Sequence, residues 1–105
     1  MTNLDRGVML RREIAPEDEI ATARAMAPFV DELWIVEDLP YAGGVAQLGP
    51  ILAATEDAKV TVGHGIAPAP FRHPVALAME WAALARMYPG RLQAGIGHGV
   101  PSWME

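Results

Sequence analysis

The sequence contains no cysteine among its 105 residues. Disulfide bonds and thiol chemistry are therefore excluded, which is typical of proteins from reducing compartments. No secretory leader is expected, because residues 1–13 do not place an apolar stretch after a basic start. Together these absences predict a cytoplasmic protein.

Basic residues and long apolar runs are scarce as well. Eight Lys and Arg stand against 13 Asp and Glu, a formal net charge of −5, and no basic run exceeds Arg11-Arg12. This balance argues against a nucleic-acid partner. The longest uncharged segment, residues 39–55, is interrupted by Pro40, Pro50 and several glycines. It is too broken to span a bilayer, so no membrane partner is expected.

What the sequence does contain is enough apolar material for one folded domain, with 51% hydrophobic and 20% charged residues. Apolar runs typical of buried strands begin near residues 8, 33, 60 and 92. The steps between them, 25 to 32 residues, match βαβ units. The alternation predicts an α/β fold with a parallel sheet.

Helices are expected between these runs, over residues 16–27, 45–55 and 74–87. The first begins with Pro16 and three acidic residues, which the positive end of the helix dipole favours, and it stops before Pro28. In the second, Pro50 either kinks the helix or marks its true start.

The third apolar run is the most unusual one. Residues 60–62 are rich in β-branched side chains, residues 63–65 read Gly-His-Gly, and Pro68 and Pro70 follow. We interpret this stretch as a strand, its glycine-kinked tip and a rigid loop, with His73 as a helix-entry residue. In a βα unit such a tip is where ligands usually bind.

Two architectures are compatible with this pattern. A closed (β/α)8 barrel takes roughly 250 residues, so four strands and three helices would form less than half of one. An open four-stranded sheet is the alternative. Periodicity and spacing do not choose between them.

Each expected strand is followed by polar residues or glycine. These groups are Arg11-Arg12-Glu13, Glu37-Asp38, Gly63-His64-Gly65 and Gly97-His98-Gly99. Parallel strands end at the same edge of a sheet, so the four groups are expected to converge on a site. Strand-to-helix turns select the same residue types for structural reasons, so the pattern alone does not establish one.

His64 and His98, with Glu37 and Asp38 nearby, would suit a metal site and hence a barrel-derived hydrolase. The alternative is that the histidines are hydrogen-bonding groups, because no two of them share one strand or helix face.

Four segments are ordered and spaced as in one known family. They are residues 31–38 (DELWIVED), 53–63 (AATEDAKVTVG), 72–78 (RHPVALA) and 89–97 (PGRLQAGIG). On these segments the chain resembles the N-terminal part of the bacterial luciferase-like monooxygenase family, which includes flavin-dependent monooxygenases and deazaflavin-dependent reductases. The resemblance runs from about residue 8 to the end.

The resemblance implies an incomplete (β/α)8 TIM barrel with roughly the first four parallel strands and three helices. Residues 1–105 would be a single domain, an N-terminal half-barrel fragment. The implied cofactor is FMN or the 8-hydroxy-5-deazaflavin coenzyme, lying across the C-terminal mouth of the barrel. A half-barrel leaves strand edges unpaired, so self-association is also expected.

The resemblance further implies which residues contact that cofactor. A non-prolyl cis peptide that supports the ring maps to Gly65-Ile66, and a ring-contacting carboxylate maps to Asp38. The cofactor-binding residues implied in this way are Asp38, Gly63, His64, Gly65, Ile66, Gly97, His98 and Gly99. Leu39 stands where deazaflavin-dependent members commonly carry histidine, and no catalytic residue or metal ligand is assigned.

We therefore expect the N-terminal segment of a flavin- or deazaflavin-dependent oxidoreductase of the monooxygenase type. A longer parent would bind the cofactor and a small organic substrate, and the isolated chain would be inactive. Two alternatives stay open: a metal-dependent hydrolase, and a non-catalytic truncated remnant that self-associates.

Overall fold

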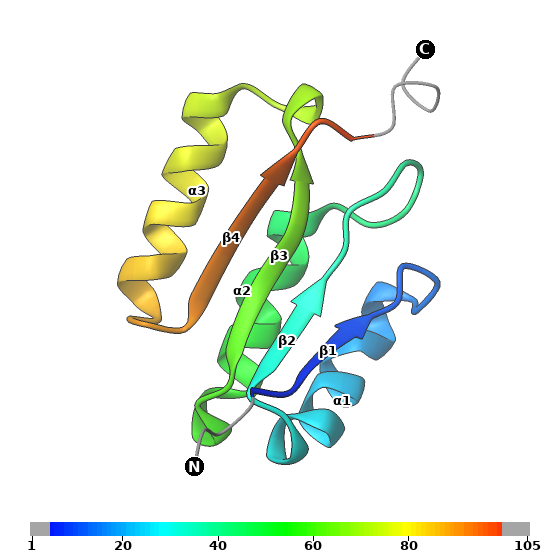
Figure 1. Cartoon of the computed structure of the whole chain (residues 1–105), viewed down its shortest axis with the longest axis vertical. Coiled ribbons are helices and arrows are strands. Elements are labelled where there is room, and N and C mark those ends of the chain that lie inside the picture. The colour runs from blue at the N-terminus through cyan, green and yellow to red at the C-terminus, as the bar shows by residue number, and fades with distance from the viewer. Residues whose placement is uncertain (1–4, 100–105) are drawn as a thin grey trace.

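The computed structural model describes residues 5–99 and shows a parallel four-stranded sheet with the strand order β1-β2-β3-β4. A helix connects each strand to the next (Figure 1). The strands are β1 (Gly7–Leu10), β2 (Glu32–Ile35), β3 (Thr61–Pro68) and β4 (Leu92–Gly97). The helices are α1 (Pro16–Met26), α2 (Gly44–Ala54) and α3 (Pro74–Met87), with short 3-10 turns at Ala27–Phe29, Glu56–Ala58 and Ala69–Phe71. The predicted α/β alternation is confirmed.

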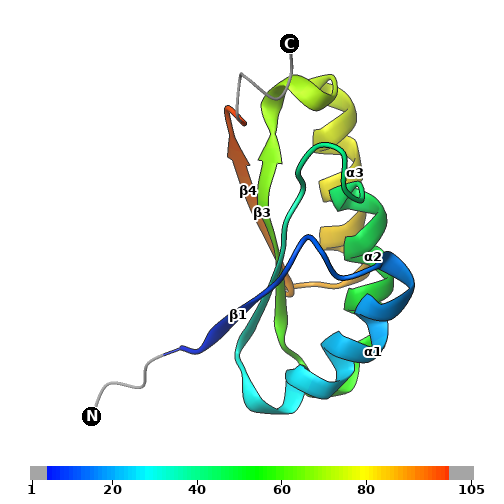
Figure 2. The same cartoon turned by 90° about the vertical axis from the view of Figure 1, so that its right-hand side faces the viewer.

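Helices α1, α2 and α3 cover the same face of the sheet, and within residues 5–99 no layer covers the opposite face (Figure 2). We call this uncovered side the open face. None of the helices within residues 5–99 is both long enough and apolar enough to cross a membrane.

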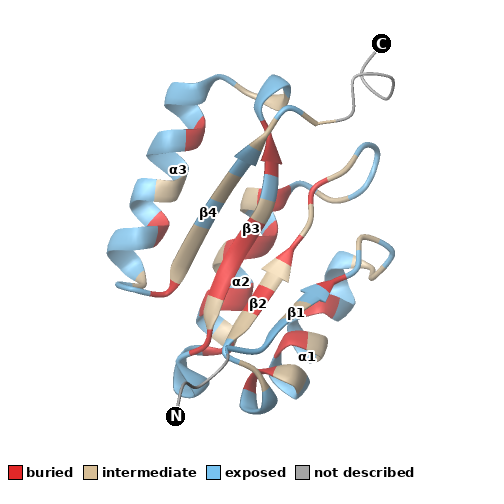
Figure 3. Ribbon diagram, in the orientation of Figure 1, coloured by how far each residue is buried: buried red, intermediate tan, exposed pale blue. Residues whose placement is uncertain are grey.

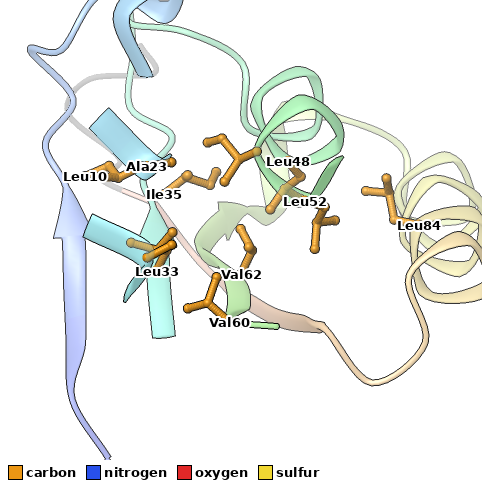
Figure 4. Close-up of a cluster of buried hydrophobic side chains, with 11 residues drawn as sticks. Leu10, Ala23, Leu33, Ile35, Leu48, Leu52, Val60, Val62 and Leu84 are labelled. Atoms are coloured by element: carbon orange, nitrogen blue, oxygen red, sulfur yellow. The ribbon is translucent and has the colours of Figure 1, made fainter. Parts of the chain in front are cut away.

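The hydrophobic core lies between the sheet and the helices (Figure 4). Leu33 and Ile35 of β2 are fully buried there, while Trp34 between them is only partly buried. This alternation follows from the two-residue period of a strand, which sends neighbouring side chains to opposite faces. The buried residues therefore gather in β2, β3 and the sheet-facing sides of the helices (Figure 3).

The helix boundaries follow the sequence signals closely. Helix α1 has Pro16 in its first turn and gives way at Ala27 to a 3-10 turn that contains Pro28. Helix α2 runs through Pro50 without a break, which decides between the two interpretations of that residue. Its neighbours Leu48 and Ile51 are fully buried, so packing against the sheet holds the helix together despite the missing N–H donor.

The interpretation of residues 63–65 as a strand tip was wrong. Strand β3 continues to Pro68, and Gly63, His64 and Gly65 lie within it. Gly63 and His64 are paired with residues of both β2 and β4, and the register shifts between His64 and Ala67. The C-terminal end of β3 therefore lies at Pro68, beyond the Gly63-His64-Gly65 segment.

At the N-terminal end of β4, the Arg91 side chain links helix α2, the residue that follows α2 and the residue that precedes β3. Its place in the sequence did not indicate this role. Its guanidinium donates to the carbonyl oxygens of Val60 (2.7 Å), Leu52 (3.1 Å) and Thr55 (3.3 Å). It also donates to Thr55 Oγ1 at 2.8 Å. The bond to Leu52 gives a partner to a carbonyl group in the last turn of α2, where helix carbonyls lack partners within the helix.

Candidate functional site

Glycines on the open face allow two large side chains to lie flat across neighbouring strands. The Trp34 ring lies over Gly63 and Gly65, and a Cβ atom built on Gly65 would be 2.7 Å from Trp34 Cε3. Ile66 lies in the same way over Gly95 and Gly97. These glycines are needed because any larger residue would meet the ring or the isoleucine.

Beside these side chains, the C-terminal ends of β2, β3 and β4 surround a hollow of about 360 Å³. We call it the strand-end hollow. It is lined by Val36, Glu37, Asp38, Gly65, Ile66, Pro68, His98 and Gly99. Its surface is mainly apolar, with the carboxylates of Glu37 and Asp38 and the imidazole of His98 among the lining groups. Hollows at this end of parallel strands are the usual ligand sites of α/β proteins.

Five of the eight residues predicted to bind a cofactor meet in this hollow. They are Asp38, Gly65, Ile66, His98 and Gly99. The peptide bond between Gly65 and Ile66 is cis, as the family resemblance implied.

The other three predicted residues do not line the hollow. Gly63 lies beneath Trp34, and Gly97 lies beneath Ile66. His64 is fully buried and contacts the helix layer, on the other side of the sheet.

Asp38 is held from the side of β1. It accepts a hydrogen bond from Arg12 Nη1 at 3.3 Å, and the Arg12 guanidinium lies 4.9 Å from the centre of the Tyr41 ring. A second hollow of about 220 Å³, lined by Met9 and Arg11 among others, shares Val36 and Asp38 with the first. The predicted convergence of the polar strand ends is therefore observed for the ends of β1 and β2.

Behind the strand-end hollow lies a buried polar cluster built on Glu37. His64 Nε2 is 3.1 Å from Glu37 Oε1, and Trp81 Nε1–H donates to His64 Nδ1 at 3.2 Å. Because Nδ1 accepts this hydrogen bond, the hydrogen-bond pattern assigns the proton to Nε2, which donates to Glu37. Both ring nitrogens of His64 are therefore occupied inside the protein.

Glu37 accepts three more hydrogen bonds. Arg72 donates through both Nη atoms, with Nη1 2.9 Å from Oε1, and the Gly44 N–H donates to Oε2 at 2.8 Å. Burial of Glu37 by itself would raise the pKa of its carboxyl. The hydrogen bonds from His64, Arg72 and Gly44 outweigh burial and lower that pKa to about 2. Glu37 is thus a buried, permanently ionised anchor at neutral pH.

The sequence carries one signal for this cluster. If the strand alternation of Leu33 and Ile35 is carried two residues further, Glu37 faces the helices and Asp38 faces the open side. Arg72 and Trp81 could not be assigned as its partners from the sequence, because they lie far along the chain.

A metal site has no support in the described structure. Residues 5–99 contain no group of three or more His, Cys, Asp or Glu that could hold an ion. His64 is turned toward Glu37 and Trp81, away from the hollow that His98 lines. His73 caps α3 by accepting from the Val75 N–H at 3.1 Å, which confirms it as a helix-entry residue.

Comparisons with known proteins give a consistent result. A family model described as luciferase-like monooxygenase matches residues 8–105. The structure of a coenzyme F420-dependent tetrahydromethanopterin reductase from Methanopyrus kandleri is similar with a TM-score of 0.80 at 24% identity, over 98% of this chain and 29% of that one. The structure of apo-MsnO8 is similar with a TM-score of 0.72 at 18% identity, over 97% of this chain and 36% of that one. No curated protein matches the chain.

Proposed function

The chain belongs to the luciferase-like monooxygenase family, and on this premise we propose that it supplies part of a cofactor site in a flavin- or deazaflavin-dependent oxidoreductase. Its four parallel strands and three helices correspond to the first part of a luciferase-like TIM barrel. The observation that carries the proposal is the meeting of Asp38, Gly65, Ile66 and His98 in one hollow at the strand ends.

The residues of the strand-end hollow fit the ring part of such a cofactor. Val36, Ile66 and Pro68 offer apolar walls for a flat aromatic system, and the backbone at Gly65 can approach it closely. Asp38 and His98 offer polar contacts to the edge of the ring. When bound, the cofactor supplies hydride transfer or oxygen activation, and these residues bind and orient it.

The hollow fits the ring better than it fits a phosphate group. Among the residues that line it there is no Lys or Arg, and phosphates are usually bound by such side chains or by helix N-termini. We therefore propose that the phosphate contacts come from outside this chain. FMN and the 8-hydroxy-5-deazaflavin coenzyme both carry a ring that this hollow could hold, so both remain candidates.

The chain spans 29% and 36% of the two solved structures to which it is similar. We propose that residues 1–105 act as the N-terminal half-barrel of a larger assembly, which acts on a small organic substrate. The isolated chain is expected to show no turnover, because the rest of the barrel wall is not part of it. The cytoplasmic location stays a prediction.

The ring-binding proposal predicts an effect of Gly65→Val. The new side chain would meet the Trp34 ring and displace it or the β3 backbone that lines the hollow, so affinity for FMN and for the 8-hydroxy-5-deazaflavin coenzyme should fall at least about tenfold. Fluorescence titration of each compound with the purified chain measures this. Ala94→Val introduces the same side chain on β4 outside the hollow, and it should leave affinity unchanged. Equal affinity of Gly65→Val and the unchanged chain would refute ring support by this strand.

We also propose that the chain associates with itself through its sheet. In the described structure β1 and β4 each pair with one neighbour only, and Met9 and Ile66 expose about half of their surfaces, 58% and 45%, on the open face. Unpaired strand edges beside exposed apolar side chains favour association.

Light scattering after size-exclusion chromatography should therefore give a multiple of the 11.3 kDa chain mass. Met9→Lys, which places a charge on the β1 edge strand, should shift the equilibrium toward the monomer, whereas Met79→Lys on the exposed side of α3 should not. A monomer at all concentrations would exclude self-association.

A further inference from the structure

Another hollow lies in the helix layer. That layer covers the side of the sheet opposite the open face (Figure 2). The hollow measures about 410 Å³ and is formed by α1, α2 and the segment that leads into α2. Its walls are mainly apolar, with Ile20, Pro50 and Ile51 among them. The volume lies within the range of small-molecule pockets, which is roughly 300–1,000 Å³. We call it the α1–α2 hollow.

One carboxylate is set into the wall of this hollow without a partner. Glu19 is 4% exposed and lines the hollow, and within residues 5–99 its side chain makes no hydrogen bond or ion pair. The small part that stays accessible includes its carboxylate oxygens, because no fully buried side-chain oxygen of the described residues lacks a partner. A buried carboxylate normally needs a donor or a cation, because its charge is costly to remove from water. Burial accordingly raises the pKa of the Glu19 carboxyl to about 6.

The charges around Glu19 indicate which sign of charge a ligand of this hollow should carry. Of the residues that line the hollow, Glu17 on the same helix is the other ionisable one, and it is also acidic. Helix α2 contributes no charged residue, only Gln47 and apolar or glycine positions. An anion would therefore meet two carboxylates and no counter-charge, whereas a cation would find one buried partner.

We propose that the α1–α2 hollow binds a small organic cation, a primary ammonium group carried on a compact apolar body. The ammonium would donate to the accessible oxygens of the Glu19 carboxylate, which have no partner within residues 5–99. The apolar body would lie against Ile20, Pro50 and Ile51. A bare divalent ion does not fit, because the described residues offer no group of three suitable ligands. The proposal is independent of the strand-end hollow and of the cofactor.

The test uses 2-phenylethylammonium chloride as the probe, titrated into the isotope-labelled chain and followed by amide chemical shifts. We expect saturable shifts at residues of the hollow, including Ala46 and Gln47. Glu19→Gln should weaken binding at least about tenfold, and Ala46→Phe, which fills the hollow from an exposed position, should abolish it. Glu17→Gln, at an exposed position, is the matched control and should change affinity less than about twofold.

Glu19→Gln leaves the fold available for this comparison, because it removes an unpartnered charge. Above about pH 6 the folded chain holds Glu19 ionised against burial, so the variant should melt at a higher temperature near pH 7.5. This difference should vanish near pH 3, well below the ordinary pKa of 4.5, where Glu19 is protonated in both states. Probe binding to the unchanged chain should likewise weaken as the pH falls below about 6.

Three results would overturn the proposal. The first is equal binding of the probe by Glu19→Gln and the unchanged chain. The second is equally tight binding of the neutral analogue 2-phenylethanol, which would leave only an apolar hollow. The third is a set of shifts confined to residues outside the α1–α2 hollow. None of the variants touches the strand-end hollow, so these results are separate from those of the cofactor experiment.

Discussion

Replacing Glu37 with methionine should lower the free energy of unfolding by about 3–5 kcal/mol, a large part of the stability of a domain of this size. The substitution leaves Arg72, the His64 Nε2–H and the Gly44 N–H without the carboxylate that they share. Most of the lost stability comes from these donors, because a buried donor without an acceptor keeps its full desolvation penalty. Urea unfolding followed by circular dichroism measures the change.

The double variant Glu37→Met with Arg72→Met is the matched control. It removes both charges of the pair, so its loss should be smaller than that of Glu37→Met alone. A double variant that is less stable than Glu37→Met would show that Arg72 contributes through contacts other than the ion pair.

The contribution of Glu37 should also depend on pH. The pKa of its carboxyl is lowered to about 2 in the folded chain from an ordinary value of 4.5. The folded chain therefore keeps Glu37 ionised more strongly than the unfolded chain does, so the stabilisation is present above about pH 4.5 and is lost as the pH falls toward 2. The stability difference between the unchanged chain and Glu37→Met should shrink over that interval and stay constant above it.

Gly44→Ala should destabilise the chain by about 3 kcal/mol or more, although alanine is ordinarily the better helix former. A Cβ atom on Gly44 would be 2.6 Å from His64 Cε1 and closer still to Nε2. The His64 ring is fully buried and is held by Glu37 and Trp81, so it has no space into which to move. The added methyl group must therefore displace the N-terminus of α2 or break the hydrogen bond to Glu37.

Gly49→Ala makes the same substitution in the same helix and serves as its control. There the new Cβ would meet Leu84 Cδ2 at 3.8 Å, an ordinary contact, so the variant should gain up to about 1 kcal/mol from helix propensity. Thermal unfolding of both variants gives the comparison. Equal melting temperatures for Gly44→Ala and the unchanged chain would show that the α2 N-terminus is not packed against His64.

The buried cluster and the strand-end hollow depend on each other through adjacent residues. Glu37 faces the helices, where Arg72 and Gly44 bind it, and Asp38 lines the hollow on the open face. Helix α2 and the segment that leads into α3 are therefore joined to the end of β2 directly behind the hollow. Loss of Glu37 should consequently disturb Asp38 as well as the stability of the fold.

The order and type of the elements follow from local signals in the sequence. Proline at the start of α1 and α3, a glycine and proline after α3, and apolar runs separated by helical segments are local signals, and the structure follows them. The four family segments determined the family for the same kind of reason, since each is a contiguous stretch that can be read without knowing its neighbours in space.

Which of the candidate residues meet depends on how the strands pair and how the helices pack. Strand pairing extended β3 through Gly63-His64-Gly65, because β2 and β4 bond to it on both sides, and this buried His64 instead of presenting it at a tip. Glu37 and its partner Arg72 are 35 positions apart in the sequence, and Arg91 and Leu52 are 39 positions apart. Local propensity carries no information over such sequence separations. Side chains so far apart in the chain are brought together by packing of the whole sheet against its helices, so their partnership is a property of the fold.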